Sequence, residues 1–127
     1  MILQPVLTVK AGFNLNKEYK MAKLTQDNLA ADGDTTVITW LGSGEGTVVI
    51  YGDDGTGTTT GHISSDSGTT YVALKDDTGS AITTTAAAMF NFDINGAEAT
   101  ADSTVRVKFT LASASAPDLN ITVFDER

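Results

Sequence analysis

The chain has 127 residues, a mass of 13.2 kDa and no cysteine, which is the size of one domain. Without cysteine it cannot form a disulfide framework, a thiolate metal site or a cysteine nucleophile. Its 16 acidic residues against 8 basic ones leave a net charge of −8, which disfavours binding to nucleic acid through phosphates.

Threonine and glycine are unusually frequent, and they point to strands and turns. The chain has 20 threonines and 12 glycines. Threonine is β-branched and favours strands, whereas glycine is common in turns. The composition therefore predicts an all-β protein with a single antiparallel β-sandwich of about seven or eight strands, jelly-roll or immunoglobulin-like in type. We expect residues 35–127 to form this acidic sandwich and residues 1–34 to form a basic N-terminal segment.

The N-terminal segment differs from the rest of the chain in charge. Residues 1–24 carry four lysines and one glutamate, a net charge of +3, whereas residues 25–127 carry 4 basic and 15 acidic residues, a net charge of −11. Such asymmetry is typical of an interaction arm, although the lysines would also neutralise the acidic body if they lay over it. The first apolar run is broken by Gln4, Pro5 and Lys10, so we expect neither a signal peptide nor a membrane-spanning helix.

The next segment, residues 16–28, is compatible with a short amphipathic helix or an irregular linker. From residue 35 onward, short apolar runs alternate with clusters of glycine and aspartate, a spacing typical of antiparallel strands. The predicted strands cover residues 35–41, 47–51, 58–64, 69–75, 88–94, 103–111 and 119–124. Alternation of side chains assigns one face of each strand to the core. The predicted core residues are Val37, Val48, Ile50, Phe90, Phe92, Val107, Phe109, Ile121 and Val123.

Two of the predicted strands, residues 35–41 and 47–51, are apolar on both faces. Ile38 and Trp40 lie opposite the core face of the first strand, and Val49 and Tyr51 lie opposite the core face of the second. Such strands need cover on both sides, either from the N-terminal segment or from a second chain. The second possibility predicts a homo-oligomer, a dimer or a trimer.

Residues with catalytic or metal-binding chemistry are few. His62 is the only histidine, and no nucleophile elbow accompanies it, so we expect no enzyme activity. Acidic residues gather beside glycine in three loops, where turn geometry explains them and a structural calcium ion is the alternative. These loops contain Asp32 and Asp34, Asp53 and Asp54, and Asp76 and Asp77. None of them matches the spaced pattern of a calcium-binding loop, so we expect no cofactor.

Residues 35–127, rich in threonine and glycine after a short N-terminal segment, resemble small virion proteins of tailed bacteriophages, of the head decoration and head-fibre type. The resemblance is strongest in the segment FNFDINGAEATADSTVRVKF (residues 90–109) and the closing segment SAPDLNITVF (residues 115–124). It implies a non-enzymatic structural protein, located in the virion, that binds the major capsid protein or other virion subunits and neither nucleic acid nor membrane. The alternative is a carbohydrate- or cell-surface-binding sandwich, such as a tail or receptor-binding accessory domain, for which a cluster of Trp40, Tyr51 and Tyr71 would serve.

The residues expected to contact a partner combine the apolar and basic side chains of the N-terminal segment with two aromatic residues of the two-faced strands. The lysines can approach an acidic surface, and the apolar side chains supply contact area. These candidates are Ile2, Leu3, Leu7, Val9, Lys10, Phe13, Lys17, Lys20, Lys23, Trp40 and Tyr51.

Overall fold

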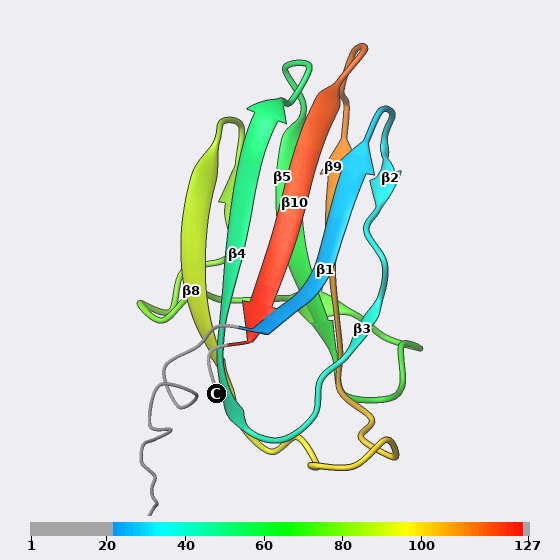
Figure 1. The fold of residues 1–127 in the computed structure, drawn as a ribbon, viewed down its shortest axis with the longest axis vertical. Coiled ribbons are helices and arrows are strands. Elements are labelled where there is room, and N and C mark those ends of the chain that lie inside the picture. Colours follow the sequence, from blue (N-terminus) through cyan, green and yellow to red (C-terminus); the bar gives the residue numbers. More distant parts are fainter. Residues whose placement is uncertain (1–21, 126–127) are drawn as a thin grey trace, which may run out of the picture.

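The computed structural model describes residues 22–125, and within this range every helix or strand assigned is a β-strand (Figure 1). The all-β prediction is therefore confirmed for the described residues. The strands are β1 (Ala22–Leu29), β2 (Gly33–Asp34), β3 (Ile38–Thr39), β4 (Gly44–Asp53), β5 (Thr58–Ser64), β6 (Val72–Ala73), β7 (Thr83–Thr84), β8 (Ala88–Ile94), β9 (Arg106–Ala112) and β10 (Asp118–Asp125).

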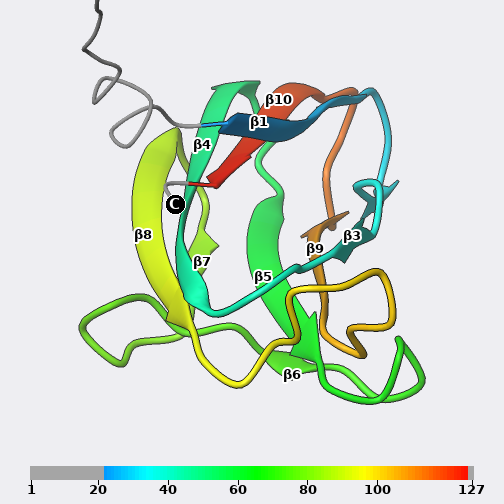
Figure 2. The ribbon, with the colours of Figure 1, turned by 60° about the horizontal axis from the view of Figure 1, so that its bottom comes forward.

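The strands form two antiparallel sheets with no strand in common, so the arrangement is not a barrel (Figures 1 and 2). The first sheet has the order β1-β10-β4-β8. In the second sheet, β9 and β5 are the two central strands and pair with each other. The free edge of β9 pairs with both β2 and β3, and the free edge of β5 pairs with both β6 and β7. Most connections pass from one sheet to the other, so neighbouring strands of a sheet are usually distant in the sequence.

A single hydrophobic core contains residues of both sheets. Its centre is a chain of three fully buried aromatic rings: the centroid of Trp40 lies 5.5 Å from that of Phe92, which lies 6.5 Å from that of Phe109. Phe92 belongs to β8 of the first sheet and Phe109 to β9 of the second, so the rings span the two layers. Tilted contacts of this kind stabilise a core beyond the area they bury.

Most of the predicted core residues are confirmed. Of the nine, seven are buried, and they are Val48, Ile50, Phe92, Val107, Phe109, Ile121 and Val123. Phe90 is half-buried and packs against the core from its margin. The prediction for Val37 is wrong, because its side chain is 46% exposed, and its strand buries the opposite face through Ile38 and Trp40.

Four of the predicted strands are confirmed in place, and two are far too long. Strands 58–64 and 88–94 coincide with β5 and β8, 47–51 lies within β4, and 119–124 lies within β10. The strand predicted at 103–111 begins three residues before β9. The strand predicted at 35–41 is reduced to β3, because the hydroxyl group of Thr35 accepts the N–H of Phe109 at 3.0 Å in place of a backbone carbonyl. The pairing with β9 then shifts by one residue between Asp34 and Ile38. The strand predicted at 69–75 is reduced to β6.

The N-terminal boundary of the folded domain was predicted too late in the chain. Residues 22–29 form β1, an edge strand that pairs with β10 from Ala22 to Leu29, so the helix or linker predicted for residues 16–28 is wrong where the structure describes it. Strand β2 also lies before residue 35 and pairs with β9. The sheets therefore include residues 22–34, which had been assigned to the basic segment. The remainder of that segment, residues 1–21, lies outside the described residues.

Gly46 tests the packing of the aromatic rings. A Cβ atom at this position would lie 2.5 Å from Phe92 and 2.6 Å from the Trp40 ring, closer than carbon atoms approach without displacement. We therefore expect Gly46→Ala to lower the free energy of unfolding by about 1–3 kcal/mol, the usual cost of overpacking a core. Urea denaturation measures this change, with Glu45→Ala at the exposed neighbouring position as the control. Equal stability of the two variants would contradict the described packing.

Candidate functional site

The outer face of the first sheet carries a hollow among the described residues. Side chains of a strand alternate between faces, and the core takes Val48 and Ile50 from β4, so their neighbours in β4 point outward. The pairing registers then place side chains of all four strands on this outer face. They include Lys23, Gln26 and Asn28 of β1, Asn120, Thr122 and Phe124 of β10, Thr47, Val49 and Tyr51 of β4, and Met89 and Asn91 of β8.

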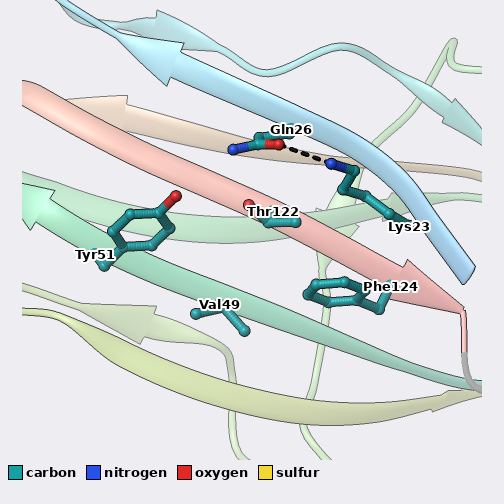
Figure 3. Close-up of a pocket in the computed structure, with 6 residues that line it drawn as sticks. All are labelled: Lys23, Gln26, Val49, Tyr51, Thr122 and Phe124. Carbon is teal, nitrogen blue, oxygen red and sulfur yellow. Dashed lines mark hydrogen bonds between the residues drawn. The ribbon is translucent and has the colours of Figure 1, made fainter. Parts of the chain in front are cut away.

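A hollow of about 400 Å³ lies across three of these strands (Figure 3). Three rows of the sheet build it. Gln26, Thr122 and Val49 are cross-strand neighbours in the middle row. Lys23 is paired with Phe124 in the row on one side, and Tyr51 lies in the row on the other side. Tyr51 follows Val49 on the same side of β4 and is 41% exposed. We call this feature the sheet hollow, lined by Lys23, Gln26, Val49, Tyr51, Thr122 and Phe124.

The sheet hollow has an apolar floor and a polar margin. The Nζ atom of Lys23 donates a hydrogen bond to Oε1 of Gln26 at 2.9 Å (Figure 3). Beyond Gln26, Nδ2 of Asn28 donates to Oδ1 of Asp118 at 2.8 Å and to Oδ1 of Asn120 at 3.2 Å. Amide and ammonium groups beside aromatic and aliphatic side chains suit the binding of a peptide or a sugar ring.

Charge on this outer face is mostly negative. Among the described residues of the face, Lys23 is the one basic side chain, and it lies on the β1 edge. Glu45 and Asp93 are cross-strand neighbours at one end of the face, and Asp53 and Asp118 are neighbours at the other. The apolar centre is therefore bounded by carboxylates at both ends.

The outer face of the second sheet holds a separate cluster around Lys108 of β9. Its Nζ atom lies 2.9 Å from Oδ2 of Asp34 and 4.3 Å from the ring centroid of Tyr71. The hydrogen bonds from Lys108 and from the hydroxyl group of Thr110 lower the pKa of Asp34. His62 is paired with Lys108 across the strands. Burial and then the charge of Lys108 lower the pKa of His62, which favours the neutral imidazole.

The aspartates of the loops act as hydrogen-bond acceptors for the turns. The carboxylate of Asp66 accepts hydrogen bonds from the hydroxyl group of Ser64 at 2.7 Å and from the backbone N–H of Thr70 at 2.8 Å. These hydrogen bonds lower the pKa of Asp66 to about 2. Asp76 accepts the hydroxyl group of Thr78 at 2.6 Å, and its pKa is also lowered. Asp53 accepts the N–H of Gly55 at 2.8 Å. In residues 22–125 no three histidine or acidic side chains gather closely enough to hold a metal ion.

The structure brings two of the predicted partner-binding residues together. Lys23 and Tyr51 both line the sheet hollow. The prediction for Trp40 is wrong, because its side chain is fully buried between the sheets against Phe92. The Nζ atom of Lys108 in the second sheet lies over the ring of Tyr71, so the cluster of Trp40, Tyr51 and Tyr71 that would serve the carbohydrate-binding alternative does not form. The other candidates lie outside the described residues: Ile2, Leu3, Leu7, Val9, Lys10, Phe13, Lys17 and Lys20.

Four of the six residues that line the sheet hollow are absent from the predicted partner contacts, although the sequence analysis expects Val49 to need cover. The inward positions Ile121 and Val123 imply that Thr122 and Phe124 point outward, so alternation alone identifies Phe124 as an exposed aromatic residue of the closing strand. Gln26 carries no such signal, because β1 is polar along most of its length and its pairing with β10 joins the two ends of the domain.

Comparison with protein-family models, with curated proteins and with solved structures found no match to this chain. The search for membrane-spanning helices, made on the described residues, found none of sufficient length and hydrophobicity.

The single histidine allows a direct test of the cluster on the second sheet. We expect the imidazole NMR signal of His62 to titrate below pH 6.5, and Lys108→Met to move the midpoint upward, because a neighbouring positive charge is removed. Since the neutral form is favoured in the folded state, protonation as the pH falls below 6.5 lowers stability. Lys23→Met, on the opposite outer face, is the control. An unchanged midpoint in Lys108→Met would contradict the described geometry.

Proposed function

We propose that the two sheets form a β-sandwich of the jelly-roll type. Strands β2 and β3 share the edge of β9, and β6 and β7 share the edge of β5, so each pair counts as one interrupted strand. Numbered 1 to 8 along the chain, the resulting strands are β1, β2/β3, β4, β5, β6/β7, β8, β9 and β10. The two sheets then have the orders 1-8-3-6 and 2-7-4-5. Each strand of the first half of the chain therefore neighbours its counterpart from the second half (1 with 8, 2 with 7, 3 with 6 and 4 with 5), as in one long antiparallel hairpin rolled into two layers. This nesting supports a jelly roll rather than an immunoglobulin-like sandwich.

We propose further that the protein is a non-enzymatic virion structural protein, a capsid decoration or head-fibre protein of a tailed bacteriophage. Jelly rolls are common in viral capsid proteins and in lectins, so the topology supports this class by analogy. The observation that carries the proposal is the contrast between the N-terminal residues and the body. A segment rich in lysine and apolar side chains leads into the edge strand β1 of a strongly acidic domain.

In this proposal the segment binds a subunit of the assembled particle, and the sheets project outward. Lysine side chains approach an acidic capsid surface that would repel the body of the protein, because most of the described carboxylates of the body are exposed. The apolar side chains between the lysines then supply buried contact area. Such attachment is weakened by salt where the charges are exposed.

A second candidate is carbohydrate binding, and the sheet hollow favours it. Tyr51 and Phe124 offer ring faces for stacking, and Gln26 offers an amide at the margin. For a sugar ligand we expect Tyr51→Ala to abolish binding in a titration with oligosaccharides, whereas Tyr71→Ala on the other sheet leaves binding unchanged. Equal effects of the two variants would contradict a site in the hollow.

The virion proposal is tested by sedimentation with capsids assembled from the major capsid protein of the same genome. We expect the full chain to co-sediment with these capsids and the variant lacking residues 1–21 to remain in the supernatant with its β-type circular dichroism spectrum retained. The triple variant Lys10→Glu, Lys17→Glu and Lys20→Glu keeps the whole chain and should also lose binding, in contrast to Lys75→Glu in an exposed loop. A folded truncated protein that still decorates capsids, or a full chain that never does, would overturn the proposal.

A further inference from the structure

The sheet hollow leaves apolar side chains in contact with solvent. Tyr51 is 41% exposed, and Met89, which neighbours Val49 across β4 and β8, is 63% exposed. Phe124 and Val49 are only half-buried at the centre of the same face. A contiguous apolar area of this kind in a soluble domain normally marks a surface that something covers.

The charges around the hollow indicate what kind of chain covers it. Carboxylates of Glu45 and Asp93 bound one end, and those of Asp53 and Asp118 bound the other. An apolar centre between acidic ends is complementary to a segment whose apolar side chains are flanked by lysines. A second copy of the sandwich would instead bring the same acidic ends against each other or against other acidic loops, which is unfavourable.

Residues 1–21 of the same chain have the required composition and the required attachment point. They contain Lys10, Lys17 and Lys20 against one glutamate. Their apolar and aromatic side chains are those of Met1, Ile2, Leu3, Val6, Leu7, Val9, Phe13, Leu15, Tyr19 and Met21, besides proline and small residues. The segment joins β1 at Ala22, which is paired with Asp125 beside Lys23 and Phe124 of the hollow.

The segment is also long enough to cross the face. Twenty-one residues extend over as much as about 70 Å, at roughly 3.3 Å a residue. A sheet of four strands is only about 19 Å wide at roughly 4.8 Å a strand. Because a short tether keeps the effective concentration of the segment high, binding to its own sheet is favoured over binding to another molecule.

We propose that, in the isolated protein, residues 1–21 lie across the outer face of the first sheet of their own chain, with apolar side chains over the sheet hollow and lysines toward its acidic ends. The segment therefore covers the apolar surface of its own chain. This inference concerns the isolated chain and does not require that the partner is a capsid.

A spin label tests the proposal, because the chain has no cysteine and one can be introduced without interference. A nitroxide at Thr8→Cys keeps the apolar neighbours of the label. We expect amide NMR signals of Val49, Tyr51 and Phe124 to lose most of their intensity, and signals of Thr60 and Lys108 on the opposite outer face to keep theirs. Reduction of the nitroxide should restore the lost intensity.

Substitutions on the two faces identify the surface that binds the segment. Val49→Lys, which places a positive charge in the hollow, should abolish the loss of intensity. Met89→Lys, at a well-exposed position on the same face, should reduce the loss of intensity. Because this lysine is exposed, the result does not depend on whether the fold accepts a half-buried lysine at position 49. Val72→Lys, at a 61% exposed valine of the second sheet, is the matched control and should leave the loss unchanged.

Three results would overturn the proposal. If the amide signals on the outer face of the first sheet keep their intensity, the segment lies elsewhere. Loss that persists in both Val49→Lys and Met89→Lys means that the hollow does not hold it. Loss in a mixture of spin-labelled chains and isotope-labelled chains that carry no nitroxide means that the segment covers a second copy. None of these results depends on capsid binding, so the proposal and the proposed function fail independently.

Discussion

The contact between Trp40 and Phe92 beneath Gly46 is the constraint on which the two-layer arrangement depends. Trp40 lies in the connection between β3 and β4, where its backbone N–H donates a hydrogen bond to the carbonyl of Val105 at 3.0 Å. Its ring enters the core only because position 46 of β4 has no side chain. Phe92 then reaches Phe109 of the other sheet, so one glycine permits a continuous aromatic contact between the layers.

Strands with strong alternation could be predicted from the sequence, and weakly patterned ones could not. β5 and β8 begin and end where the threonine-rich and Phe-Asn-Phe patterns predict. β1 is a polar edge strand, so its residues carry little hydrophobic signal, and the pairing with β10 that makes it a strand joins residues 90 to 103 positions apart. Local patterns also cannot show that the hydroxyl group of Thr35 takes the place of a backbone carbonyl. This substitution interrupts the pairing of the chain with β9 between β2 and β3.

The candidate site was predicted in part for the same reason. Lys23 is predicted as a partner contact because it belongs to the basic segment, and Tyr51 because its strand is apolar on both faces. Both line the sheet hollow. Their proximity depends on β10 lying between β1 and β4, an order that only the folded topology determines. Trp40 was assigned to a surface because its strand is apolar on both sides, but the chain turns so that Val37 rather than Trp40 faces solvent.

The edges of the first sheet explain why an interaction would use its face. On β1, Asp27 lies beside Ile121 on the inner face of the sheet, where its carboxylate accepts a hydrogen bond from the hydroxyl group of Thr36 at 2.9 Å, and the pairing is irregular between Lys23 and Thr25. Inward charges and bulges oppose the addition of another strand. At the other edge, formed by β8, the backbone N–H of Asp77 donates a hydrogen bond to the carbonyl of Asn91 at 2.9 Å. That carbonyl would otherwise pair with an added strand. With both edges obstructed, association through side chains of the outer face is favoured over extension of the sheet.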